Sequence, residues 1–331
     1  IELIEEYLNG YTKPEEKQDA TSRLIVAFAL AESGEKRSKR LSEQRRYLRD
    51  GYEKSSEDPS GYKRGFTQHL SHVAEFIKKI WPDQKHNKSD LSAVSNENDD
   101  VALLCIDYLR QSNHTITIAP LARYYSACKL AMPHEHSAAV KSFFEAIKAI
   151  TAFSILWRSS RSTTGGIDNQ YRSLMSEGCS AVGLTPLCRY IDGNIQSIPP
   201  VDDLKAALIY ILRVSGGIAC KEEWVSAASK LPLYSINRHV TRFLLLAAAH
   251  DSLPDEKEPG LVVTGKRGIL PLLNSAGWKD DALQTLEHIA PDKKSQEWCA
   301  EIYDDPDLIH RLGNLTLLPQ PENSSISNGS W

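Results

Sequence analysis

The chain has 331 residues, of which 41% are hydrophobic and 25% are charged, so it is long enough to bury a substantial core and to form more than one compact unit. Its 39 basic and 43 acidic residues give a net charge of −4, which excludes a protein that coats nucleic acid by bulk positive charge. It has no apolar run of membrane-spanning length and no CxxC pair among its six cysteines, so we expect a cytoplasmic protein without a disulfide framework or zinc ribbon. Because the sequence starts at Ile1 and stops at Trp331 inside a motif, we expect it to be part of a longer protein.

Most of the chain has apolar residues spaced three and four apart, which is typical of amphipathic helices. The sequence predicts helices over residues 16–33, 66–80, 99–111, 119–131, 136–157, 202–214 and 236–250. Capping residues support several of these starts, for example Asp99 before Val101 and Pro120 in a first turn. Residues 82–98 are polar and are predicted to form a loop. The predicted fold class is therefore mainly α.

Changes in composition indicate where the chain divides. Residues 159–168 are rich in Ser, Thr and Gly, and residues 251–266 carry two prolines, two glycines and many charges. We predict a helical domain over residues 1–250, which the 159–168 stretch could split into two subdomains, a linker at 251–266, and a small C-terminal unit at 267–331.

The C-terminal unit contains three linked motifs, at residues 285–291 (TLEHIAP), 310–318 (HRLGNLTLL) and 323–328 (NSSISN). Hydrolysis of a phosphodiester needs a general base for water and a cation to offset charge on the phosphate. Glu287 and His288 are neighbours in a predicted strand, so their side chains point to opposite faces. One can therefore hold a metal while the other meets the water.

A second predicted strand, Asn314–Leu318, has a β-favouring Leu-Thr-Leu-Leu pattern and ends at Pro319. Asn323 follows nine residues after Asn314. The oxygen donors of Glu287 and Asn323 suit a hard cation such as Mg²⁺. Cysteine is absent from these positions, which argues against zinc.

These motifs resemble the HNH nuclease domain at the C-terminus of GmrSD-type restriction enzymes, which are type IV, modification-dependent systems. The His-x-x-Pro signature matches at His288 and Pro291, the Gly-Asn-Leu-Thr-Leu strand at 313–317, and the Asn-rich segment at 323–328. The resemblance implies a small ββα-metal (HNH) unit behind the helical domain. Because the chain stops at Trp331, the closing helix of that unit has room for only a turn or two.

The resemblance also implies a role for each matched residue. His288 would be the general base, and Glu287 and Asn323 would be ligands of one Mg²⁺ or Mn²⁺ ion. Asn314 would be the central Asn that ties the loop to both strands and orients His288. His310 stands where relatives often carry a His, either in contact with phosphate or as a structural residue next to the strand.

The function implied is a metal-dependent endonuclease that hydrolyses DNA in restriction or anti-phage defence. Its expected partners are DNA and a ParB-like NTPase domain, upstream in the same protein or on a partner subunit, and it could assemble as a homo-oligomer. Three alternatives stay open: an HNH scaffold that has lost catalysis, a non-catalytic regulatory module, and an HNH nuclease that cleaves RNA.

Other polar clusters carry weaker hypotheses. Arg40, Arg45, Arg46 and Arg49 belong to a dense basic run that could follow a phosphate backbone, although a solvated helical face explains it equally simply. Arg311 is a further candidate for nucleic-acid binding. His69 and His72, three apart on a predicted helix, are more typical of packing or surface residues than of metal ligands.

Overall fold

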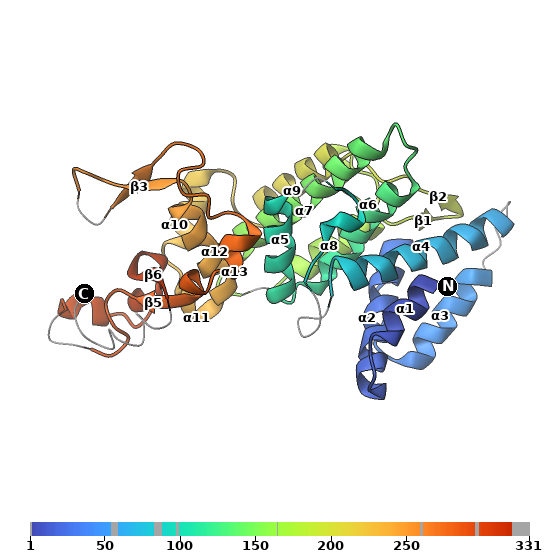
Figure 1. Ribbon diagram of the computed structural model, residues 1–331, viewed down its shortest axis with the longest axis horizontal. Coiled ribbons are helices and arrows are strands. Elements are labelled where there is room, and N and C mark those ends of the chain that lie inside the picture. Colours follow the sequence, from blue (N-terminus) through green and yellow to red (C-terminus); the bar gives the residue numbers. More distant parts are fainter. Residues whose placement is uncertain are drawn as a thin grey trace. The chain divides into compact units, whose positions relative to one another are not determined.

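The computed structural model describes residues 2–53, 59–82, 88–96, 99–163, 165–258, 261–294 and 298–319, and it is mainly helical, as the sequence predicts (Figure 1). The helices are α1 (Glu2–Asn9), α2 (Pro14–Ser33), α3 (Leu41–Glu53), α4 (Pro59–Lys79), α5 (Asp100–Gln111), α6 (Ile118–Leu130), α7 (His136–Ser159), α8 (Ile167–Ser176), α9 (Val201–Val214), α10 (Lys221–Ala228), α11 (Leu233–Ile236), α12 (Arg238–Ala249) and α13 (Ser275–Lys279). The strands are β1 (Tyr190–Ile191), β2 (Asn194–Ile195), β3 (Ser252–Pro254), β4 (Val262–Thr264), β5 (Thr285–His288) and β6 (Leu315–Leu318). In the described part of the chain, no helix is both long and apolar enough to cross a membrane.

The seven predicted helices correspond to α2, α4, α5, α6, α7, α9 and α12. The predicted cap at Asp99 is present, because its Oδ1 accepts a hydrogen bond from the Ala102 N–H at 2.9 Å. The helices without a sequence prediction, such as α8, are mostly short. Helix α8 begins inside the predicted 159–168 loop, where Gly166 adopts a left-handed conformation immediately before Ile167.

The chain forms two compact units, which we call unit 1 and unit 2. Unit 1 comprises residues 1–102, 109–151 and 166–211, and unit 2 comprises 103–108, 152–165 and 212–331. This division differs from the predicted boundary at residue 250, because α11 and α12 pack with the C-terminal strands: α12 contacts β6, and α11 contacts the 3-10 turn Leu308–His310.

The predicted linker at 251–266 is instead an antiparallel hairpin, in which β3 pairs with β4 and Leu253 lies opposite Val263. Asp251 fixes its base, since its carboxylate accepts hydrogen bonds from the N–H groups of Gly268 at 2.8 Å and Leu270 at 3.0 Å. Pro254 and the described charged residues of this stretch therefore belong to a paired hairpin, which composition alone does not distinguish from a linker.

The core of unit 1 is organised around one buried carboxylate. Glu32 on α2 is 1% exposed, and Arg189 donates to it twice, from Nε at 2.7 Å and from Nη2 at 2.6 Å. His69 on α4 adds a third contact, with Nδ1 at 2.7 Å from Glu32 Oε2. Burial lowers the pKa of His69 to about 4, so this histidine is neutral at pH 7. His72 bonds Ser126 Oγ at 2.8 Å, and both histidines are thus packing residues.

We expect Glu32→Gln to lower the free energy of unfolding by about 3–5 kcal/mol, because it leaves the buried Arg189 guanidinium without a counter-charge. The matched control is Glu6→Gln. Glu6 pairs with Lys78 at 2.6 Å, but its side chain is 54% exposed, so its loss should change the free energy of unfolding far less. Chemical denaturation of both variants measures the difference. Equal effects would contradict a structural role for the Glu32–Arg189 pair.

The core of unit 2 positions α12. Trp278 is buried, and its ring centre lies 6.1 Å from those of both Tyr108 and Phe243. Arg242 on α12 donates to the backbone carbonyls of Leu283 at 2.8 Å and Trp278 at 2.5 Å. These contacts hold α12 against the segment that leads into β5.

Candidate functional site

The candidate site is built on the hairpin of β5 and β6, which lies beside α12 in unit 2 (Figure 1). The strands pair antiparallel, with Glu287 opposite Thr316 and His288 opposite Leu315. Side chains alternate along a strand, so Glu287 and His288 lie on opposite faces. Their environments differ accordingly: His288 is 8% exposed, whereas Glu287 is half-buried.

Asn314 fixes the loop that follows His288. Its Nδ2 donates to the carbonyls of Ala290 at 3.0 Å and Ile309 at 2.9 Å, and its Oδ1 accepts from the Ala290 N–H at 2.8 Å. The Ile289 N–H also donates to the Asn314 carbonyl at 2.8 Å. One amide side chain therefore joins the end of β5, the start of β6 and the turn that carries His310.

His310 is brought directly against His288. The distance from His288 Nε2 to His310 Nδ1 is 3.0 Å, a hydrogen bond between two imidazoles. The other nitrogen of His310, Nε2, lies 3.8 Å from the Asp292 carboxylate. Burial lowers the pKa of His288; the nearby His310 and Arg238 lower it further and Asp292 opposes them. The His288 imidazole is therefore neutral at pH 7.

Tyr234 on α11 covers the histidine pair, a contact that the sequence does not predict. Its ring centre is 4.4 Å from that of His288, with the planes at 61°, and 5.6 Å from that of His310, with the planes at 10°. Arg238, the first residue of α12, places its guanidinium carbon 4.4 Å from the centre of the Tyr234 ring. No local motif marks these residues, which lie about fifty positions before His288 in the chain.

Of the predicted nucleic-acid-binding arginines, Arg311 belongs to unit 2 and the other four belong to unit 1. Arg311 is paired with Asp305 at 3.0 Å. Arg40, Arg45, Arg46 and Arg49 are exposed side chains of unit 1, where Arg40 pairs with Glu43 and Arg49 with Asp50. Exposure of these four arginines is expected both of a solvated helical face and of a surface that binds phosphate.

Of the two predicted metal ligands, only Glu287 can be placed. Asn323 lies outside the described residues, as do the rest of its motif and any closing helix of a ββα unit. Within the described ranges, no group of three or more His, Cys, Asp or Glu side chains is arranged to hold a metal. The donor that is present, the half-buried carboxylate of the residue before His288, fits a Mg²⁺ ion, which keeps most of its waters and needs one or two protein carboxylates.

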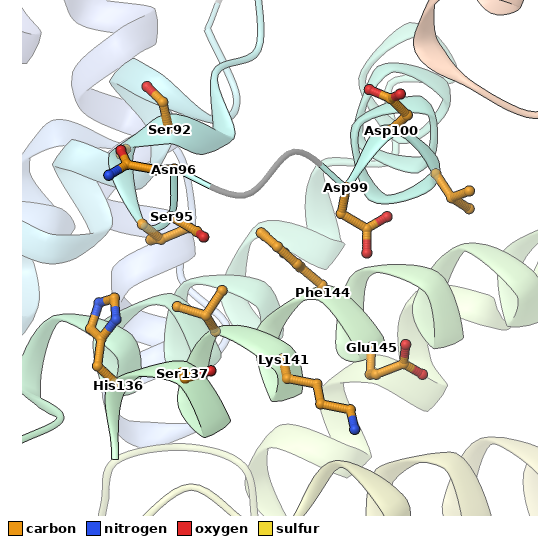
Figure 2. A pocket seen from close by; sticks show the side chains of 14 residues that line it. Ser92, Ser95, Asn96, Asp99, Asp100, His136, Ser137, Lys141, Phe144 and Glu145 are labelled. Carbon is orange, nitrogen blue, oxygen red and sulfur yellow. The ribbon is translucent and has the colours of Figure 1, made fainter. Parts of the chain in front are cut away.

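Unit 1 contains a separate pocket of about 790 Å³, between α7 and the segment that leads into α5 (Figure 2). Figure 2 shows Asp99 on one side of it and Lys141 and Glu145 of α7 on the other. Both carboxylates are neutralised by lysines: Asp99 and Glu145 share Lys148, at 2.7 and 3.3 Å, and Glu145 also meets Lys205 at 3.0 Å. These ion pairs join helices of unit 1, and we assign no chemistry to the pocket.

Residues 227–331 match the family described as GmrSD restriction endonucleases, C-terminal domain. This match confirms the resemblance predicted from the motifs. It also begins well before the motifs, and therefore includes Tyr234 and Arg238. A comparison with curated proteins finds no match. The C-terminal third of the chain is thus similar to the C-terminal domain of a group of restriction endonucleases, which suggests the nuclease part of such an enzyme.

We expect Asn314→Asp to destabilise the site, because it removes both donated hydrogen bonds and faces a carboxylate toward two carbonyl oxygens. The expected loss is about 2–3 kcal/mol, measured as faster hydrogen exchange in the peptide that spans residues 285–293. Asn194→Asp is the control, since the Asn194 amide makes an exposed bond to Asp192. Unchanged exchange in Asn314→Asp would show that the amide does not hold the loop.

Proposed function

We propose that residues 227–331 form a metal-dependent HNH nuclease centre that hydrolyses DNA phosphodiester bonds, with His288 as its general base. The observation that carries the proposal is the part-buried hydrogen bond between His288 and His310, whose rings Tyr234 contacts. It lies on the hairpin that bears the matched motif, in a segment similar to a restriction endonuclease domain.

The hydrogen bond constrains where the protons of the two imidazoles reside. A neutral imidazole has one N–H and one lone pair. If His288 donates from Nε2 to His310 Nδ1, the lone pair of His288 stays on Nδ1, and the N–H of His310 stays on Nε2 beside the Asp292 carboxylate. In the reverse arrangement, the His310 Nε2 lone pair faces that carboxylate, and the single lone pair of His288, on Nε2, is engaged by the His310 N–H and cannot accept a proton from water. The charge of Asp292 favours the first arrangement.

The favoured arrangement suits general-base catalysis. His288 Nδ1 is the atom that accepts a proton from the attacking water, and His310 holds the opposite nitrogen of the same ring. The lowered pKa of His288 keeps this ring unprotonated at neutral pH, as a base requires. Asn314 positions the ring by fixing the loop next to it.

Glu287 is the residue we propose to hold the cation, together with Asn323. A bound Mg²⁺ or Mn²⁺ would offset the negative charge that builds up on the phosphate during cleavage. The placement of Glu287 on the face opposite His288 keeps the carboxylate from taking the proton intended for the imidazole.

We expect His288→Ala to lower Mg²⁺-dependent nicking of supercoiled plasmid by about 10²- to 10⁴-fold, the usual contribution of a general base. The measurement is the initial rate of nicking by the purified full chain. His134→Ala is the matched control, because the His134 side chain is 79% exposed in unit 1. Nicking by His288→Ala at the wild-type rate would refute the assignment.

We expect Glu287→Gln to raise the Mg²⁺ concentration for half-maximal nicking by at least about 10-fold, the loss typical even of an outer-sphere partner of a metal. Chelation with EDTA should abolish nicking by the wild type. Glu258→Gln changes an exposed glutamate of the β3–β4 hairpin in the same way, and should leave the requirement unchanged. EDTA-resistant nicking would contradict the metal-dependent mechanism.

The proposal extends to the setting of the enzyme. Similarity to a restriction endonuclease domain supports DNA as the substrate. We further propose a cytoplasmic defence system in which a ParB-like NTPase domain is the partner. Parallel assays on plasmid, single-stranded DNA and RNA separate this proposal from an RNA-cleaving HNH enzyme. A non-catalytic module would nick none of them.

A further inference from the structure

The histidine pair is covered by two residues that lie outside the HNH motifs, Tyr234 and Arg238. Tyr234 is half-buried against both imidazoles, whereas Arg238 is exposed. The guanidinium of Arg238 lies over the Tyr234 ring, a cation–π contact that restricts the arginine to part of its range. It is near enough to His288 to be one of the charges that lower the pKa of that residue, after burial and His310.

Arg238 differs from two nearby arginines, Arg242 and Arg311, in the partners of its guanidinium. Arg242 donates to two backbone carbonyls, and Arg311 is paired with Asp305. Among the residues that the structure describes, Arg238 forms no ion pair with Asp or Glu. The Arg238 guanidinium is therefore exposed, lies over the Tyr234 ring next to the candidate base, and is not neutralised by a carboxylate of the described residues.

We propose that Arg238, which Tyr234 holds in place, binds a backbone phosphate of the nucleic acid. This phosphate lies next to the phosphodiester bond at which His288 acts as the general base. This inference rests on the proposed nuclease function and assigns its substrate contact. A guanidinium binds phosphate oxygens through two parallel N–H donors. Its positive charge also stabilises the negative charge that develops during cleavage. We assign to Arg238 the phosphate-binding role that the sequence predicted for Arg311, because Asp305 already neutralises Arg311.

The test measures binding of a short DNA duplex by the full chain at several NaCl concentrations, in a His288→Ala background that does not cleave. Adding Arg238→Ala should weaken binding by about 10-fold or more and reduce the slope of log Kd against log salt by about one ion. Arg238→Lys keeps the positive charge but lacks the two parallel N–H donors of the guanidinium. Compared with Arg238→Ala, it should therefore restore the salt dependence of Kd but only part of the affinity. Arg267→Ala, at an exposed arginine after β4, is the control and should change neither quantity by as much.

The same substitutions in the chain with His288 intact separate the two proposals. If the wild type nicks plasmid, and Arg238→Ala nicks and binds as the wild type does, the phosphate site is wrong and the nuclease assignment stands. If the wild type binds DNA through Arg238 but never nicks it, the nuclease assignment fails and the phosphate site stands. Equal losses in Arg238→Ala and Arg267→Ala would overturn the phosphate site, since they would indicate a general charge effect.

Discussion

The hydrogen bond between His288 and His310 is the interaction on which this account of unit 2 depends. His288 Nε2 and His310 Nδ1 are 3.0 Å apart, so only one of these two nitrogens can carry a proton. Each ring therefore determines the tautomer of the other. Burial beneath Tyr234 disfavours protonation of His288. The register of β5 and β6 and the three hydrogen bonds of Asn314 bring the rings to this distance. The hairpin, the loop and α11 therefore support one chemical state, a neutral imidazole with an available lone pair.

Charged side chains have different partners in the two units. In unit 1, Glu32 and Arg189 neutralise each other in the core, and the lysines around Asp99 and Glu145 neutralise carboxylates at the surface. These pairs stabilise helix packing. In unit 2, the arginine over Tyr234 has no such partner in the described residues. A chain with a net charge of −4 must bind a polyanion through local positive groups. The Arg238 guanidinium next to His288 is such a group.

Much of the fold could be predicted from the sequence, because apolar spacing marks the long helices directly, as in α2 and α7. The link from Asn314 to the loop that follows His288 was also predictable, since the motifs fix the order and spacing of these residues. The hairpin at 252–264 was not, because Asp251 organises it through backbone N–H groups that have no sequence signature. Tyr234 and Arg238 were not predictable either: their contact with the site arises from tertiary packing of α11 and α12, not from local sequence. The same packing places the boundary of unit 2 well before the predicted linker.

The most direct test of the central claim is the tautomer of His288, measured by ¹⁵N NMR of the histidine side chains in the full chain at pH 7. We predict a neutral His288 ring whose Nε2 carries the proton and donates it to His310 Nδ1, and whose Nδ1 is unprotonated. Assignment of the signals is made by comparison with His288→Ala. A proton on Nδ1, or a charged imidazolium, would leave His288 unable to act as the base and would contradict the account.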